Sequence, residues 1–222
     1  MRTTRVLLVV GCLLALLIGA VFGPPLHADP RTIHPGKARW PIKTSVQPGT
    51  PKVVPLADLL TLADPPGVTK HDPRFQATRI PQFPNALGVQ EGDLVTVIGW
   101  LHLVAGEDDG DYHIQVSYRP TSGDQCLIVE VPRPEPAFVA SGTVRQTART
   151  VRDFIKSKLL HNQEPSSRGS VMTHPVLVTI TGQLFYDDAH VGDEPRGKKG
   201  MKAATLWELH PVTAIGFAPT PP

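Results

Sequence analysis

Hydrophobic and polar positions between residues 93 and 215 alternate in runs that predict five strands and one helix. Side chains with a period of two predict strands, and a spacing of three and four residues predicts the helix. The strands are expected at 93–103, 111–118, 126–131, 176–185 and 205–215, and the helix at 143–159. Three strands, a helix and two strands are typical of an OB-type barrel. We therefore expect a mainly β fold: a five-stranded OB-type barrel with its helix between strands three and four.

The alternation also predicts which side chains face the core. In the first strand, Gly99 is expected at a bend. The residues expected to point inward are Val95, Val97, Leu101, Leu103, Tyr112, Ile114, Val116, Leu127, Val129, Val131, Trp207 and Leu209. Trp100, Asp111, His113 and Glu130 then lie on the outer face, and a register error of one residue would exchange the two faces.

The helix has a predicted start, an apolar face and a basic face. Thr143 and Gln146 have the spacing of a capping box. Residues expected to plug the barrel are Val144, Ala148, Val151, Ile155 and Leu159. A second stripe consists of Arg145, Arg149, Arg152 and Lys156. It is interpreted as a solvated face, with an anion- or nucleic-acid-binding face as the alternative.

The chain before the barrel has two parts. Residues 1–28 combine Arg2 and Arg5 with an apolar run at 6–23, which predicts a signal peptide cleaved after Ala28. The alternative is an uncleaved membrane anchor formed by residues 6–23. Export to the periplasm or beyond the cell follows, with attachment to the inner membrane in the anchored alternative. Residues 29–87 form a proline-rich spacer or strap, 88–218 the barrel domain and 219–222 a tail.

The proline-rich segment contains one stretch with helical spacing. Thirteen of the 24 prolines lie between Pro24 and Pro84, and proline favours extended backbone. Residues 55–63 are expected to form one or two helical turns whose leucines dock on the barrel. After cleavage, the remaining cysteine is Cys126, which is interpreted as a buried strand residue rather than a reactive thiol.

Three acidic residues precede a histidine by two positions: Asp111 before His113, Asp188 before His190, and Glu208 before His210. Residues two apart share a strand face, so each carboxylate is expected beside its own histidine. An antiparallel pairing of strands two and three brings Glu130 to the same place as Asp111 and His113.

A histidine with two carboxylates is a ligand set for a divalent metal ion. Asp111, His113 and Glu130 are therefore the candidate metal ligands and candidate catalytic residues. The alternative interpretation is a salt-bridge cluster on a polar face.

Further candidates for ligand binding are Trp100, His190, Lys198, Lys199 and His210. Lys198 and Lys199 belong to a basic loop at 196–202 that could hold phosphate, although acidic residues upstream oppose this role and favour a solvated loop. His210 is more often bonded to backbone than to a metal, and a tryptophan in a barrel strand more often belongs to the core. Pro211, inside the last strand, predicts an edge or a bulge.

The sequence lacks the motifs of serine hydrolases, nucleotide-binding loops and structural zinc sites. A net charge of +2 makes nucleic acid an unfavoured partner. The leading hypothesis is a non-enzymatic binding module of the cell envelope, whose partner is an envelope protein or polymer. The alternatives are a metal-dependent hydrolase of the phosphodiesterase or nuclease type, and a protein-interaction unit held at the membrane.

Four segments together resemble an uncharacterised group of exported bacterial proteins with an OB-like domain. The segments are 107–113 (EDDGDYH), 128–132 (IVEVP), 185–190 (FYDDAH) and 207–212 (WELHPV). The resemblance spans residues 89–215 and implies the same barrel and export. A looser similarity to thermonuclease-type barrels implies strand carboxylates around calcium, but the paired arginines of those enzymes have no match in this chain.

Overall fold

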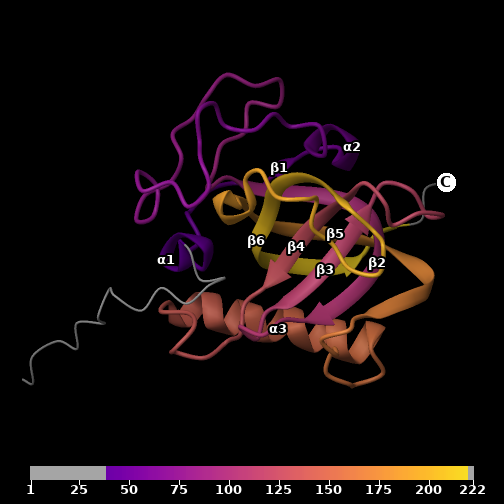
Figure 1. The fold of residues 1–222 in the computed structure, drawn as a ribbon. Coiled ribbons are helices and arrows are strands. Elements are labelled where there is room, and N and C mark those ends of the chain that lie inside the picture. Colours follow the sequence, from indigo (N-terminus) through magenta and orange to yellow (C-terminus); the bar gives the residue numbers. More distant parts are fainter. Residues whose placement is uncertain (1–38, 220–222) are drawn as a thin grey trace, which may run out of the picture. The chain divides into compact units, whose positions relative to one another are not determined.

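Five strands close into a barrel in the computed structural model, which describes residues 39–219 (Figure 1). The strands are β2 Leu94–Gly106, β3 Tyr112–Ser117, β4 Cys126–Val131, β5 Ser170–Tyr186 and β6 Ala203–Phe217. Their order is β2-β3-β4-β6-β5, and β5 pairs with β2 to close the ring. All of these pairings are antiparallel except that of β4 with β6. The predicted order of three strands, a helix and two strands is confirmed, because α3 (Gly142–Leu159) lies between β4 and β5.

The barrel interior holds the main hydrophobic core. Tyr112, Ile114 and Val116 of β3 face inward, as do Leu127 and Val129 of β4. Val131 of β4 and Trp207 and Leu209 of β6 also face inward. Burying a side chain of this size contributes about 1.5–3 kcal/mol each. The inward residues predicted for β3, β4 and β6 are confirmed.

The first barrel strand departs from the predicted alternation at one place. Its register shifts between Leu101 and Leu103, which is a β-bulge. The extra residue reverses the alternation, so Val104 joins the barrel core in place of Leu103. The irregularity therefore lies after Gly99, not at it. A side chain at Gly99 would collide with Leu56 and Val116, so close packing explains this glycine.

The helix starts earlier than its predicted capping box. Ser141 is the N-cap, and its hydroxyl accepts a hydrogen bond from the Val144 amide at 3.3 Å. The prediction of Thr143 as the cap is wrong, because Thr143 lies inside the first turn. The predicted apolar face is confirmed, and all five of its residues are buried. Its packing places α3 at one end of the barrel, as Figure 1 shows.

The basic stripe of α3 binds the protein's own backbone. Arg145 donates to the carbonyls of Val139 and Ala140. Arg149 donates to the Pro134 carbonyl, and Arg152 lies over the Tyr112 ring at 3.5 Å. These contacts fasten the segment between β4 and α3, and they use the arginines that an anion-binding face would need.

Residues 39–93 cover part of the barrel and contribute to its core. They contain α1 (Trp40–Lys43), β1 (Lys52–Val53) and α2 (Leu56–Leu59). The stretch at 55–63 forms one helical turn, and its leucines at 56, 59, 60 and 62 are buried against the barrel core as predicted. Arg39 and Glu91 form a fully buried ion pair at 2.7 Å that ties the two ends of this segment together.

The last strand pairs irregularly at its proline. Between Gly182 and Leu184 of β5 the partner in β6 changes from Val212 to Leu209, so two residues, His210 and Pro211, stand against Gln183 alone. This confirms the bulge predicted from Pro211. No helix among residues 39–219 is long and apolar enough to cross a membrane. The predicted signal or anchor at 1–28 lies outside the described residues.

Candidate functional site

The outer face of β3, β4 and β6 carries acidic and histidine side chains, and each of them is almost completely buried. The exposed fractions of Asp111, His113, Glu130 and His210 are 1%, 4%, 2% and 0%. Their position on the outer face agrees with the alternation of the strands. Burying a charged group costs much free energy unless the group is paired. We therefore expect the side chains of this face to form a connected network.

Two segments of the chain seal this face. From one side, α1 brings Lys43 over β4, where its ammonium lies 2.7 Å from Glu130 Oε2. From the other side, the loop between β5 and β6 lies on Gln115 of β3. The Lys198 amide donates to Gln115 Oε1 at 2.7 Å, and Gln115 Nε2 donates to the Met201 carbonyl at 3.3 Å. The outer face of β3 and β4 is thus covered by the protein itself.

The acidic and histidine side chains pair across strands. His113 stands opposite Glu130 in the register of β3 and β4, and its Nδ1 lies 3.2 Å from Glu130 Oε1. Asp111 meets His210 of β6, with 3.0 Å between Oδ2 and Nε2. The expectation that each carboxylate lies beside its own histidine is therefore wrong. Residues opposite each other on paired strands lie closer together than residues two positions apart on the same strand.

The His210 ring has an acceptor beside each of its nitrogens. Its Nδ1 lies 2.8 Å from the Lys43 carbonyl, which can only accept, so Nδ1 donates a hydrogen bond there. Its Nε2 then faces Asp111 and, at 3.6 Å, Glu130 Oε2. Burial by itself would raise the pKa of Glu130, but the Lys43 ammonium and the His113 ring hold that pKa well below its ordinary value. The Glu130 and Asp111 carboxylates raise the pKa of Lys43 in spite of its burial.

The His113 ring also has acceptors beside both of its nitrogens. Its Nε2 lies 3.3 Å from Gln115 Oε1, which already accepts from the Lys198 amide. Its Nδ1 faces Glu130 and also Glu107 Oε1, at 3.3 Å. Two groups of potential metal ligands result, namely Glu107 with His113 and Glu130, and Asp111 with His210 and Glu130. The predicted trio does come together, but Asp111 and His113 belong to different groups that share Glu130.

A second charged group surrounds Arg196, in the loop that precedes β6. Its guanidinium contacts the carboxylates of Asp187 and Glu208. Asp187 also lies 2.6 Å from Nδ1 of His190, which belongs to η1 (Asp188–His190). Burial by itself would raise the pKa of Asp187, but Arg196 and His190 lower it to about 2. An ionised carboxylate on Nδ1 orients the His190 ring.

Beside this group lies a cleft of about 490 Å³. One wall is the segment Leu60–Asp64, and another is the start of β6 at Ala203–Leu206. His190 and Arg196 line the cleft. The His190 side chain is 37% exposed, and its Nε2 has no hydrogen-bond partner within residues 39–219. The cleft therefore offers one accessible imidazole nitrogen beside a buried, ionised carboxylate.

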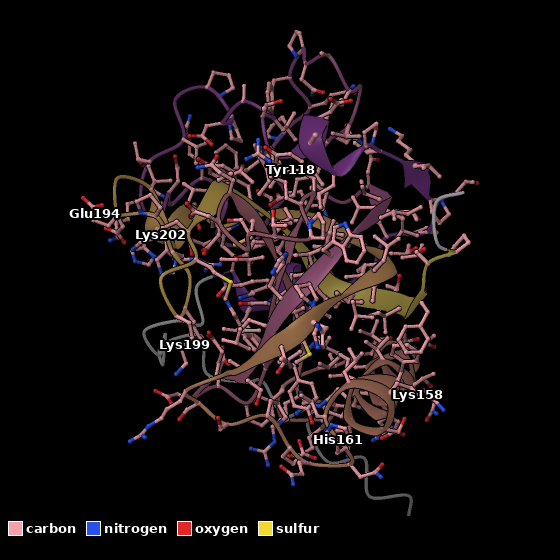
Figure 2. All side chains as sticks on the ribbon, turned by 90° about the vertical axis from the view of Figure 1, so that its right-hand side faces the viewer. Tyr118, Lys158, His161, Glu194, Lys199 and Lys202 are labelled. Atoms are coloured by element: carbon pink, nitrogen blue, oxygen red, sulfur yellow. The ribbon has the colours of Figure 1, made fainter. Side chains whose placement is uncertain are left out.

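The other predicted site residues lie apart from this cleft. Trp100 is half-buried on the outer face of β2. Lys199 is exposed, and Figure 2 shows it at the outside of its loop. Lys198 is half-buried with its ammonium 3.3 Å from Glu107 Oε1. Cys126 is buried as predicted, and burial raises the pKa of its thiol to about 11, which leaves it unreactive at neutral pH.

Several residues of the network have no individual signal in the sequence. Lys43 lies in the proline-rich segment, and Glu107 lies in a turn before β3. Gln115 lies in the strand predicted at 111–118 and belongs to no motif. Arg196 is part of the basic loop at 196–202, whereas the structure gives it two carboxylate partners. All four residues join the charged groups of the site through tertiary contacts.

Neither a protein-family model nor a curated protein nor a solved structure matches this chain.

Proposed function

We propose that this protein is an exported binding module of the bacterial cell envelope, built on an OB-type barrel, with its ligand site in the cleft beside His190. One observation carries this proposal. The face of strands two and three that OB barrels use for ligands corresponds to the outer face of β3 and β4, which the chain itself covers through Lys43 and Gln115. The cleft at the border of this covered face is open.

The lining of the cleft indicates the kind of ligand. Leu60 and Leu62 supply an apolar wall, and His190 and Arg196 supply polar groups. The Arg196 guanidinium is occupied by two carboxylates, so its contribution to a ligand is small. A cleft of this volume suits a small molecule, or the end of a polymer, with one apolar side and one hydrogen-bonding group.

The test is a binding screen of the purified full chain by ligand-observed NMR. The probes are envelope glycan fragments, muropeptides and short apolar peptides. We expect one class to bind, and Ala204→Arg, which fills the cleft, to abolish its signal. Lys158→Ala, on an exposed residue at the end of α3 (Figure 2), is the matched control. A probe whose binding survives Ala204→Arg would place the ligand site elsewhere and contradict the proposal.

A metal-dependent hydrolase of the phosphodiesterase type is the second candidate. The observation in its favour is the meeting of two histidines and two further carboxylates around Glu130. Its test is hydrolysis of bis(p-nitrophenyl) phosphate with added Mn²⁺, Zn²⁺ or Ca²⁺. Turnover that disappears in His113→Gln but persists in Ala204→Arg would support the enzyme over the binding module.

A further inference from the structure

We propose that Glu107, His113 and Glu130 bind one divalent transition-metal ion, with His113 Nδ1 as the nitrogen ligand. The proposal goes beyond the binding function and does not depend on the cleft, because none of these residues lines it. It also differs from the trio predicted from the sequence, since Glu107 takes the place of Asp111.

The separations between ligand atoms fit a tetrahedral ion. His113 Nδ1 lies 3.2 Å from Glu130 Oε1 and 3.3 Å from Glu107 Oε1. All three ligand atoms lie within 4.8 Å of one another. In a tetrahedron with metal–ligand bonds of about 2.0–2.1 Å, neighbouring ligand atoms are about 3.3–3.4 Å apart. Small changes in the Glu107 and Glu130 rotamers would bring all three atoms to bonding distance.

The hydrogen bonds outside this group prepare His113 as a ligand. Gln115 cannot reverse its amide, because its Oε1 accepts from the Lys198 amide and its Nε2 donates to the Met201 carbonyl. Oε1 therefore accepts from His113 Nε2, which must carry a hydrogen. With Nε2 bonded to Gln115, Nδ1 is the ring nitrogen that faces the two carboxylates. A divalent ion between these three atoms would supply the positive charge that the Glu107 and Glu130 carboxylates attract there. Outer partners that fix the tautomer of a histidine are typical of metal sites.

The neighbouring ligand group already has a cation. The Lys43 ammonium lies 2.7 Å from Glu130 Oε2, on the side where Asp111 and His210 converge. A metal ion beside that ammonium would meet direct charge repulsion. Glu130 Oε2 therefore pairs with the Lys43 ammonium, and Glu130 Oε1 is the oxygen that would bind the metal ion. One ion per chain is the expected stoichiometry.

Access to the proposed site runs along Glu107. The Glu107 side chain is 32% exposed, whereas those of His113 and Glu130 are 4% and 3% exposed. The half-buried Lys198 ammonium lies 3.3 Å from Glu107 Oε1, the oxygen that would bind the ion. An incoming ion must displace this ammonium, and removal of its charge should therefore strengthen binding.

The experiment is isothermal titration of the purified, chelator-treated full chain with Zn²⁺, Mn²⁺ and Mg²⁺ at pH 7.5. We expect one Zn²⁺ per chain, tightened several-fold by Lys198→Met, weakened about 10-fold or more by Gln115→Leu, and lost in His113→Gln. His174→Gln removes an exposed histidine of β5 and should change nothing. Circular dichroism checks that each variant is folded.

A second measurement needs no variant. Co²⁺ added to the wild-type chain should give the strong visible absorption of tetrahedral coordination at one equivalent, and Zn²⁺ should remove it. Absence of Zn²⁺ binding at 100-fold excess over micromolar protein, or binding that is equal in His113→Gln and wild type, would overturn the proposal. In that case the His113 ring only links the two carboxylates by hydrogen bonds. Ligand binding in the cleft is tested independently of the metal site, by the Ala204→Arg variant.

Discussion

At the scale of single residues, Glu130 organises the buried face. One carboxylate meets the Lys43 ammonium and the His113 ring directly, and His210 at 3.6 Å. In such a pair the attraction offsets the cost of removing two charges from water, and the net gain is small. Removal of one partner is different, because the other charge stays buried without compensation. The effect of a substitution here therefore depends on which charges remain.

Glu130→Gln should lower the free energy of unfolding by about 3–5 kcal/mol, because it leaves Lys43 buried without its carboxylate. Urea unfolding at pH 7 measures this change. In Lys43→Met/Glu130→Gln the loss should be smaller than the sum of the two single losses. The exposed pair Arg133 and Glu135 is the control, and Glu135→Gln should change stability by less than about 0.5 kcal/mol. Equal effects at the two sites would contradict a buried network.

Asp109→Asn should stabilise the protein above neutral pH and have little effect in acid. Burial, and then the nearby Asp111 carboxylate, raise the pKa of Asp109 from 3.8 to about 6. A carboxyl group whose pKa is raised on folding favours the folded state below the unfolded pKa, and that contribution is lost as pH rises through 6. Asparagine keeps the acceptor for the Asp111 amide without the charge. Melting temperatures from pH 3.5 to 8 provide the test, and an offset independent of pH would contradict it.

At the scale of elements, each departure from the sequence pattern has a local cause. The bulge in β2 adds one residue between Leu101 and Leu103, and the alternation reverses after it. The first residue of α3 depends on which hydroxyl accepts a hydrogen bond from a free backbone amide. Ser141 and Thr143 are both residue types that commonly cap helices. The structure decides in favour of Ser141, which has extended backbone outside the first turn.

Ser141→Ala should cost about 1 kcal/mol, because the Val144 amide loses its acceptor. Thr143→Ala should cost less than about 0.5 kcal/mol, because Thr143 lies within the first turn and its side chain is exposed. Urea unfolding of the two variants compares them directly. The reverse order would show that the helix begins at the capping box predicted from the sequence.

At the scale of the whole described chain, the proline-rich segment belongs to the folded domain. Leu59 is fully buried in the same core as the barrel strands, and Arg39, Lys43 and Trp40 all contact residues far along the chain. This segment closes the outer face that would otherwise be open to ligands.

Leu59→Ala should destabilise the protein by about 2–5 kcal/mol, as expected for a cavity in a packed core. Urea unfolding followed by tryptophan fluorescence and by circular dichroism should remain one coincident transition. An exposed neighbour, Ala57→Ser, is the control. A loss below about 0.5 kcal/mol in Leu59→Ala would mean that the segment is a spacer with no share in the core.

Local patterns in the sequence predict the five barrel strands, the helix α3 and most of the core. Strand alternation and helical spacing are local patterns, and burial of one face is enough to select them. This is why the order of strands, the inward residues of β3, β4 and β6, and the apolar face of α3 follow from the sequence. The bulge in β2 and the start of α3 do not, because each depends on packing that the local pattern leaves open.

Only the tertiary structure decided the site. Asp111, His113 and Glu130 could be placed on one face, but their partners come from α1, from β6 and from the loop before it. Whether a charged face meets water or other charges depends on which distant segments cover it. Contacts such as Lys43 with Glu130, or Arg196 with Glu208, form between residues that no local period relates. The pairing of the charged groups and the open cleft therefore exist only in the folded chain.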